Sequence, residues 1–441
     1  MINDILEQVL ALAKKGGASA AEAYGSEDSS TELTVRQAVR ESITHAQTKT
    51  LTLRLWKDDR VVSVTSSDLE KSSLENLVEE ALLLAGQVPA DPLARLAEEN
   101  LLEKNPPILE LFDNKNLDIN EMLETAQKME AKALAHKDVV MSEGADVSAS
   151  FHKRALLTSG GFHGEYRVSH FARSVSVVAE KNGEKERDYA FSQARFYDDL
   201  VSAEEIGLEA ANRSAERLGA KTIATKAMPV VWEQRVARQL LGYFLSAING
   251  ASVARGGSFL EKFLGQKIFP EQISIYQDPR IARGLASCPF DGEGVCNNRL
   301  ALIENGVLKN WLLDTRSALQ LGLKSNGSAV RSSGLPSPGA SNVFLSPGAI
   351  SPKELIGEIS EGFYLTETIG MGLNLVTGDL SLGAAGYLIE KGERTNPVHG
   401  VTIAGSLFDL FASLTPANDV SHDSAFVVPT IRTDGLMIAG K

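Results

Sequence analysis

The first part of the chain alternates between helical and strand-like spacings of apolar side chains. Residues 2–13 place apolar side chains three and four positions apart, with Asp4 and Glu7 between them, which predicts an amphipathic packing helix. Residues 31–66 hold the alternating, β-branched stretches typical of strands, and residues 69–88 return to helical spacing. This part therefore predicts helices packed on strands.

A longer region of strands follows a second predicted helix. Asp118 opens that helix, because Glu121 three residues later completes a capping box. Residues 139–197 then alternate apolar and polar side chains in long runs separated by turns, which predicts an antiparallel sheet with one solvent-exposed face. Ser202 and Glu205 form another capping box and predict a further helix.

A polar tract and the apolar strand MPVVW change the pattern near residue 225, where we place a domain boundary. Residues 1–224 then form an N-terminal α+β domain and residues 225–441 a C-terminal domain. Asn305-Gly306 predicts a tight hairpin in the second domain, because both positions tolerate positive φ. The predicted fold class is α+β: helices on a mixed or antiparallel sheet, then a β-rich domain with antiparallel sheets and flanking helices.

Composition narrows the class of protein. A length of 441 residues favours two domains. The net charge of -13, without a local basic stripe, disfavours direct nucleic-acid binding. No apolar run approaches the ~18 residues of a membrane span, and the acidic first helix is unlike a secretory signal, so we expect a cytoplasmic protein with no membrane role. Cys288 and Cys296 stand alone and indicate neither a disulfide framework nor a zinc site.

The stretch from residue 238 to 259 runs from an apolar helix into a loop of Gly, Ala and Ser, and it matches no common catalytic motif. It lacks the lysine of a P-loop, and Leu260 stands where a nucleophile elbow needs a glycine. The seven histidines form no HExxH or HExxxH pair, and His163 and His170 are expected on opposite faces of a strand. The periodicity favours a buried packing helix.

Two segments resemble signature segments of the TldD/PmbA peptidase family, in its PmbA branch, also called TldE. They are residues 289–327, PFDGEGVCNNRLALIENGVLKNWLLDTRSALQLGLKSNG, and residues 370–393, GMGLNLVTGDLSLGAAGYLIEKGE. The similarity of layout extends over nearly the whole chain. In the TldD branch, a helix after the strand equivalent to MPVVW carries an HExxxH motif. Its two histidines and a later cysteine hold zinc, and its glutamate is the general base.

The resemblance implies that these metal positions are replaced in this chain. The motif falls on residues 241–246, where Leu241 and Ser246 replace the histidines and Gly242 replaces the glutamate. No cysteine follows Cys296, so the third ligand is missing as well. We therefore expect no catalytic residue, no metal site and no cofactor in this chain.

The same resemblance implies a catalytically silent member of a hydrolase family. A TldD-type chain, which holds the zinc, and a TldE-type chain form a heterodimer that hydrolyses unfolded peptides, and the chain can form a homodimer when alone. The substrate is enclosed, with its backbone paired like an added strand. Family members have been linked to leader-peptide removal, to antitoxin degradation and, historically, to modulation of DNA gyrase.

The Gly-rich segment from residue 372 to 386 is the candidate lining of a peptide or partner cleft. Its glycines permit close backbone approach, and Asn374, Thr377, Gly378 and Asp379 are the candidates that orient a peptide or partner. The same composition is equally typical of a turn between core strands.

Two alternative functions remain open from the sequence. In one, the chain is a peptidase by itself, with a different metal arrangement that uses His399 or His422. In the other, it is a homodimeric protein that captures peptides without protease activity. The zinc content of the purified chain and its association with a TldD-type chain separate these alternatives from the silent subunit.

Overall fold

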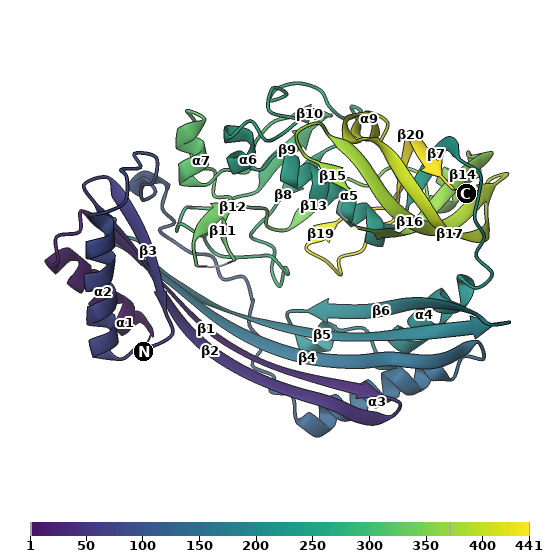
Figure 1. The fold of residues 1–441 in the computed structure, drawn as a ribbon, viewed down its shortest axis with the longest axis horizontal. Helices are drawn as coiled ribbons and strands as arrows, with labels where there is room; N and C mark the ends of the chain where they lie inside the picture. The colour runs from purple at the N-terminus through teal and green to yellow at the C-terminus, as the bar shows by residue number, and fades with distance from the viewer. Residues whose placement is uncertain (1, 333, 371, 441) are drawn as a thin grey trace.

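The computed structural model describes residues 2–332, 334–370 and 372–440, and its N-terminal half is built on a curved six-stranded sheet (Figure 1). The strands run in the order β3-β2-β1-β4-β5-β6, and all neighbours are antiparallel. Their bounds are β1 (Ala20–Arg36), β2 (Val39–Lys57), β3 (Arg60–Ser66), β4 (Val139–Thr158), β5 (His163–Lys181) and β6 (Glu184–Ala194). The predicted α+β fold is confirmed, with longer strands than the pattern indicated.

The first strand begins well before residue 31, the start of the predicted strand region. Residues 20–30 are mostly small or polar and lack a strand-like apolar alternation. This stretch is still a strand because it pairs with β2 and β4, and a Cβ added at Gly25 would lie 2.6 Å from the side chain of Ile2. The strand thus packs closely against the first helix, and the local spacing of residues does not reveal this tertiary contact.

Four helices give the long sheet two separate hydrophobic cores. Helices α1 (Ile2–Lys15) and α2 (Lys71–Ala85) pack at one end, and α3 (Ile119–Leu134) and α4 (Ala203–Glu216) pack at the other. Ser202 caps α4, because its hydroxyl accepts the N–H of Glu205 (3.2 Å), but the predicted box is only half formed, since the Glu205 carboxylate accepts the Ser202 hydroxyl and not its backbone N–H. The capping box predicted at Asp118 is not formed: its carboxylate accepts the N–H of Asn120 instead.

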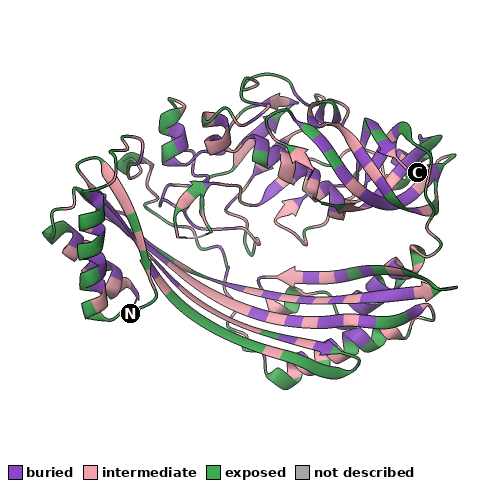
Figure 2. Cartoon of the chain, in the orientation of Figure 1, coloured by how far each residue is buried: buried purple, intermediate pink, exposed green. Residues whose placement is uncertain are grey.

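The second face of the sheet is half-buried and not open to solvent. Side chains between the buried positions of β4 and β5 are mostly intermediate in exposure, and residues 51–56 of β2 are all buried (Figure 2). The reason is that the C-terminal half lies over this face (Figure 1). The prediction of one solvent-exposed face for the sheet of residues 139–197 is therefore wrong for β4 and β5, whose second face is only partly exposed.

The C-terminal half contains a closed ring of five strands. The pairing order β14-β7-β20-β17-β16 is completed because β16 also pairs with β14, and β15 and β18 extend it. The pair β14–β7 is parallel, so the ring is a mixed sheet in which the other pairs are antiparallel. The bounds are β7 (Lys226–Trp232), β14 (Glu361–Ile369), β15 (Leu373–Asn374), β16 (Asp379–Glu390), β17 (Glu393–Ser406), β18 (Thr415–Pro416) and β20 (Ile431–Ala439).

A second sheet, in the order β10-β9-β8-β13-β19, shares one core with the ring and with helix α5 (Gln234–Ala247). The hairpin predicted at Asn305-Gly306 joins β9 to β10, and both turn residues have positive φ, 49° and 79°. The other bounds are β8 (Ile275–Gln277), β9 (Leu300–Glu304), β10 (Val307–Leu308), β11 (Ala329–Arg331), β12 (Pro336–Pro338), β13 (Val343–Leu345), β19 (Phe426–Val427), α6 (Gly250–Ala254), α7 (Thr315–Gln320), α8 (Pro352–Gly357) and α9 (Leu407–Ala412).

Ion pairs join the two halves. Glu22 on β1 accepts a hydrogen bond from Arg331 on β11 at 2.6 Å, and both side chains are under 5% exposed. At the other end of the sheet, Arg217 after α4 lies within 3.5 Å of Asp188 on β6 and pairs with Glu367 on β14. In the described part of the chain, no helix is long and apolar enough to cross a membrane.

Candidate functional site

Helix α5, which follows β7 directly, carries the positions of the expected metal motif. Its apolar residues recur at helical spacing and fill the core beside β7 and β14. Leu241 belongs to this core face and is 4% exposed. Gly242 and Ser246 lie one turn apart on the opposite face, where a Cβ added at Gly242 would meet no atom within 4 Å. The fold thus places Gly242 and Ser246 together and Leu241 apart from them.

The side chains at these positions do not fit a zinc ion. Zn²⁺ is bound by Cys, His, Asp or Glu, whereas Leu241 is a hydrocarbon, Gly242 has no side chain, and the Ser246 hydroxyl donates to the Gly242 carbonyl (2.9 Å). No residue of these four types occurs from 234 to 260. Across residues 2–332, 334–370 and 372–440, no three such side chains form a group that could hold a metal ion.

The open face of α5 carries a neutral hydrogen-bond network. Gln239 donates to the Tyr243 hydroxyl (2.6 Å) and accepts from the Thr368 hydroxyl on β14. Burial raises the pKa of Tyr243, so this phenol stays protonated at neutral pH. Such side chains can hold polar groups of a peptide in place, but none of the three can take a proton from water at neutral pH.

The four candidate cleft residues lie in the turn between β15 and β16 and bind one another. Asn374 Oδ1 accepts the N–H groups of Val376 (3.0 Å) and Thr377 (3.4 Å), and the Thr377 hydroxyl donates to the Asp379 carboxylate (2.6 Å). Gly378 has a φ of 80°, and its N–H donates to the Asn374 carbonyl (2.7 Å). The structure therefore brings all four together, with their polar atoms engaged inside a tight turn.

This turn is anchored to the loop that follows α5 and α6. The N–H of Phe259 donates to the Leu375 carbonyl (2.9 Å), and a Cβ added at Gly378 would lie 3.1 Å from the Phe259 ring. The side chain at the tip of the turn, Val376, is 61% exposed. The turn is thus held, through Phe259, against the loop that follows the expected metal helix.

The histidines named as alternative metal ligands lie in separate environments. His399 on β17 is half-exposed, with Nδ1 3.2 Å from a Glu186 carboxylate oxygen. His422 lies in the loop before β19, with its ring centroid 6.2 Å from that of Phe344. His163 and His170 pair regularly with β4 and therefore face opposite sides of the sheet, as predicted.

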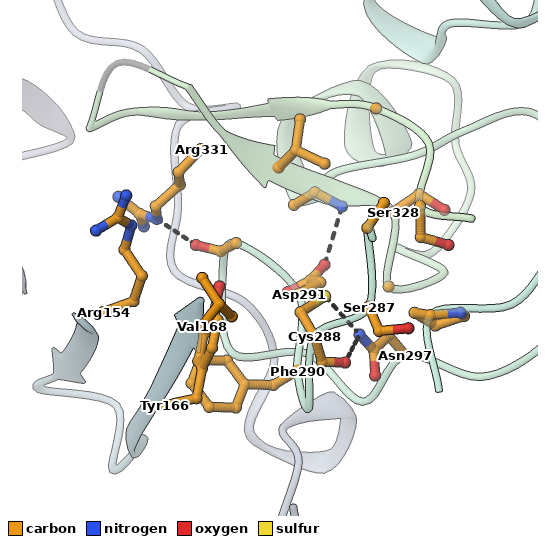
Figure 3. A pocket seen from close by; sticks show the side chains of 18 of the residues that line it. Arg154, Tyr166, Val168, Ser287, Cys288, Phe290, Asp291, Asn297, Ser328 and Arg331 are labelled. Atoms are coloured by element: carbon orange, nitrogen blue, oxygen red, sulfur yellow. Dashed lines mark hydrogen bonds between the residues drawn. The ribbon is translucent and has the colours of Figure 1, made fainter. Parts of the chain in front are cut away.

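Sequence reasoning missed a cavity of about 340 Å³ between the six-stranded sheet and loops of the C-terminal half (Figure 3). Arg154 and Tyr166 enter from β4 and β5, with Arg331 beside Arg154 and Phe290 beside Tyr166. In the sequence, the only indication of this cavity is the segment PFDGEGV, which places two acidic residues among glycines. The strands that form the rest of the cavity wall lie more than a hundred residues earlier in the chain, and local patterns do not indicate that they meet this loop.

The acidic residues of that loop are deeply buried. Asp291 accepts the N–H groups of Glu293 and Val295 (both 2.8 Å) and of Ala329 (3.1 Å). Glu293 accepts both the N–H and the hydroxyl of Thr315, each at 2.7 Å. Burial raises the pKa of both carboxyls, and the neighbouring Asp291 charge raises that of Glu293 further.

The cysteine beside this loop is an unreactive thiol. Cys288 accepts a hydrogen bond from the Asn297 side-chain amide at 3.2 Å. Burial raises the pKa of Cys288 to about 12, so the thiolate that a metal or a nucleophilic mechanism requires is not populated at neutral pH. Cys288 and Cys296 are both free.

Sequence profiles of known families match nearly all of this fold. Residues 21–85 match domain 1, residues 112–218 the central domain, and residues 225–440 the C-terminal domain of the PmbA/TldA metallopeptidases. A Thermotoga maritima protein that carries the name of a DNA gyrase modulator is 26% identical, with a TM-score of 0.90 over 100% of both chains. TldE from Thermococcus kodakarensis has the same fold, with a TM-score of 0.88 at 22% identity over 99% of this chain and 100% of the other.

Curated relatives agree with these profiles. The metalloprotease PmbA of Escherichia coli O157:H7 is 33% identical over 99% of this chain and 96% of its own length. The PmbA homologue of Haemophilus influenzae is 32% identical over 97% of this chain and 94% of its own. The resemblance inferred from the two signature segments is confirmed, and the chain belongs to the PmbA/TldD metallopeptidase family.

Proposed function

We propose that this chain is the catalytically silent, TldE-like subunit of a two-chain zinc metallopeptidase that cleaves unfolded peptides. The zinc and the general base belong to a TldD-type partner. The observation that carries the proposal is the open face of α5: the family fold is complete around it, yet it offers Gly242, Ser246 and amide or hydroxyl groups where a zinc ion needs charged or imidazole donors.

The comparisons support a partner of this kind. Haemophilus influenzae has relatives named as a PmbA homologue and as a TldD homologue, and so does Buchnera aphidicola from Acyrthosiphon pisum. A chain that lacks metal donors and coexists with a second type of the same family is suited to assembly and substrate enclosure. In this proposal, the present chain positions the peptide and excludes water while its partner supplies the metal chemistry.

The turn from Asn374 to Asp379 is the proposed contact with the partner or the peptide. Its polar atoms satisfy one another, so it is a rigid feature that presents one exposed apolar side chain, Val376. It also lies at the edge of the C-terminal ring, where β15 pairs with β16. A rigid, exposed apolar contact at a strand edge suits association, because little conformational entropy is lost on binding.

The proposal is tested by mixing this chain with the TldD-type chain of the same organism. Zinc per chain, the mass of the mixture and cleavage of an unstructured fluorogenic peptide are measured. We expect no stoichiometric zinc and no cleavage from this chain alone, and a heterodimer with chelator-sensitive cleavage from the mixture. Chelator-sensitive cleavage by this chain alone would show a self-standing peptidase. Peptide binding without association with the TldD-type chain would show a homodimeric binding protein.

A matched pair of variants tests the contact surface. Val376→Asp places a charge on the turn, and Val420→Asp places one on a loop elsewhere, where Val420 is 39% exposed. We expect Val376→Asp to weaken heterodimer formation at least about tenfold, the size of ~1.4 kcal/mol, because a charge is then desolvated in the contact. Equal affinities for the two variants would contradict the role of the turn.

A further inference from the structure

The cavity between the sheet and the C-terminal loops contains a positive charge that no acidic side chain compensates. Three arginines line it: Arg331 pairs with Glu22, and Arg154 pairs with Asp28 (2.6 Å). Arg195, which follows β6, has no carboxylate within 4.0 Å among the described residues. The cavity therefore has two paired guanidinium groups and one that is paired with no anion.

Arg195 is buried and held rigidly toward this cavity. Its side chain is 8% exposed and donates to the carbonyls of Ser169 (3.0 Å), Gly284 (3.3 Å) and Leu285. A guanidinium carries five N–H groups, so these three bonds leave donors over. Burial lowers the pKa of Arg195, yet an arginine remains charged in proteins, and an anion beside it would offset the cost of its desolvation.

Asp291 does not supply that anion. Its carboxylate lines the same cavity but accepts three backbone N–H groups, those of Glu293, Val295 and Ala329. These bonds hold Asp291 in its own loop, and it is not within ion-pair distance of Arg195. The compensating group is therefore expected from outside the chain.

Two further atoms of the cavity wall are buried without a hydrogen-bond partner. They are Asn297 Oδ1 and Ser341 Oγ. The orientation of Asn297 is set by its other end, since Nδ2 donates to both the carbonyl and the sulfur of Cys288 (3.0 and 3.2 Å). Buried polar atoms seldom lack a partner. Both oxygens are closed off from the cavity space here, so a donor of the ligand reaches them when the wall shifts around it.

The remaining wall is aromatic and apolar. Phe290 contacts Phe162 and Tyr166 with ring centroids 4.9 and 5.3 Å apart, and Val168 lies beside them. A cavity of about 340 Å³ is at the small end of ligand sites and suits one or two amino-acid residues. A ligand for this site thus needs a carboxylate, an N–H group and an apolar side chain.

We propose that this cavity binds the C-terminal residue of a peptide, with the carboxylate at Arg195, an amide N–H at Asn297 and an apolar side chain against Phe290. A free amino acid offers the same chemistry, and the experiment separates the two sources. The site goes beyond the proposed function and does not depend on it, because binding is measured on this chain alone.

Calorimetric titration of the full chain with N-acetyl-Ala-Phe, its C-terminal carboxamide, phenylalanine and acetate tests the site. We expect the acetylated acid to bind at least about tenfold more tightly than the amide and than acetate. Tighter binding of phenylalanine than of the acetylated acid would assign the site to free amino acids and contradict capture of a peptide end. Equal affinities of acid and amide, or no binding of any probe at millimolar concentration, would overturn the proposal.

Two pairs of variants test whether the probe binds in this cavity. Arg195→Gln keeps N–H donors for the carbonyls but removes the charge, so this variant should bind the acid and the amide about equally. Arg255→Gln, at an exposed position, should keep the preference for the acid. If Arg195→Gln fails to fold, Ala286→Leu serves, because it fills the cavity without touching a polar group. It should abolish binding, whereas Ala282→Leu, exposed in the same loop, should not. Retained acid preference in Arg195→Gln, or retained affinity in Ala286→Leu, would contradict the site.

Discussion

Replacing the buried Glu293 by glutamine should remove a pH dependence of stability that the native chain carries. The Glu293 carboxyl is 4% exposed, and burial together with the Asp291 charge raises its pKa to about 8. Asp291 accepts three backbone N–H groups, which favour its charged form, so the shared proton belongs on Glu293. Glutamine mimics that protonated carboxyl and keeps an oxygen for both bonds from Thr315.

The direction in which stability changes with pH follows from whether the folded or the unfolded chain binds the proton. Between the unfolded pKa of Glu, about 4.3, and the folded value, the native chain holds one proton that the unfolded chain has lost. Stability from this group is therefore fully present below the unfolded pKa and falls as the pH rises through the folded pKa. One proton corresponds to about 1.4 kcal/mol per pH unit over this range.

Urea unfolding of the native chain and of Glu293→Gln across this range measures the effect. We expect the free energies of unfolding to agree within about 1 kcal/mol near pH 5 and the variant to be the more stable near pH 8, with equal urea dependence. Glu304→Gln is the control, because Glu304 is exposed and its ion pair with Lys309 is a surface pair. A constant difference between native chain and Glu293→Gln at every pH would refute the reasoning.

Two further predictions concern packing and charge. Glu22→Gln leaves the Arg331 guanidinium buried without its carboxylate and should lower the free energy of unfolding by about 3–5 kcal/mol, against less than about 1 kcal/mol for the more exposed Glu27→Gln, measured by urea unfolding. Gly242→Ala should raise stability by about 0.5–1 kcal/mol, because open space surrounds this helical glycine. Gly207→Ala should lower the stability, because its Cβ would lie 2.3 Å from a backbone carbonyl of α3. Thermal unfolding of both variants measures the two effects. A change of stability in the same direction for both variants would contradict the prediction.

Local patterns predicted the elements whose determinants are local. The Asn305-Gly306 hairpin and the Ser202 cap form as expected, because each depends on a few neighbouring residues. The early start of β1 was not predictable in this way, since residues 20–30 become a strand by pairing with β2 and β4 and by packing Gly25 on α1. Tertiary pairing there outweighs weak local propensity.

The candidate sites show the same division. The absence of metal donors on α5 follows from residue types alone, and it is independent of how the helix is placed. Which of its residues face the core depends on how the helix is placed. Leu241 packs in the core, whereas Gly242 and Ser246 face outward. Arg195 and Asn297 are about a hundred residues apart and meet in one cavity only through the long sheet, so no spacing along the chain indicated them.

The open face of α5 bears on the proposal that this chain contacts a partner. A face without function is expected to fill with packing, because open space beside a helix forfeits dispersion contacts. Gly242 still borders open space, Ser246 is exposed, and the neighbouring Gln239 and Tyr243 satisfy each other's polar groups. The turn that presents Val376 is held by Phe259, which lies in the loop after α6. An open and polar face on a helix that otherwise packs in the core is suited to contact with another chain, which is what the proposed subunit requires.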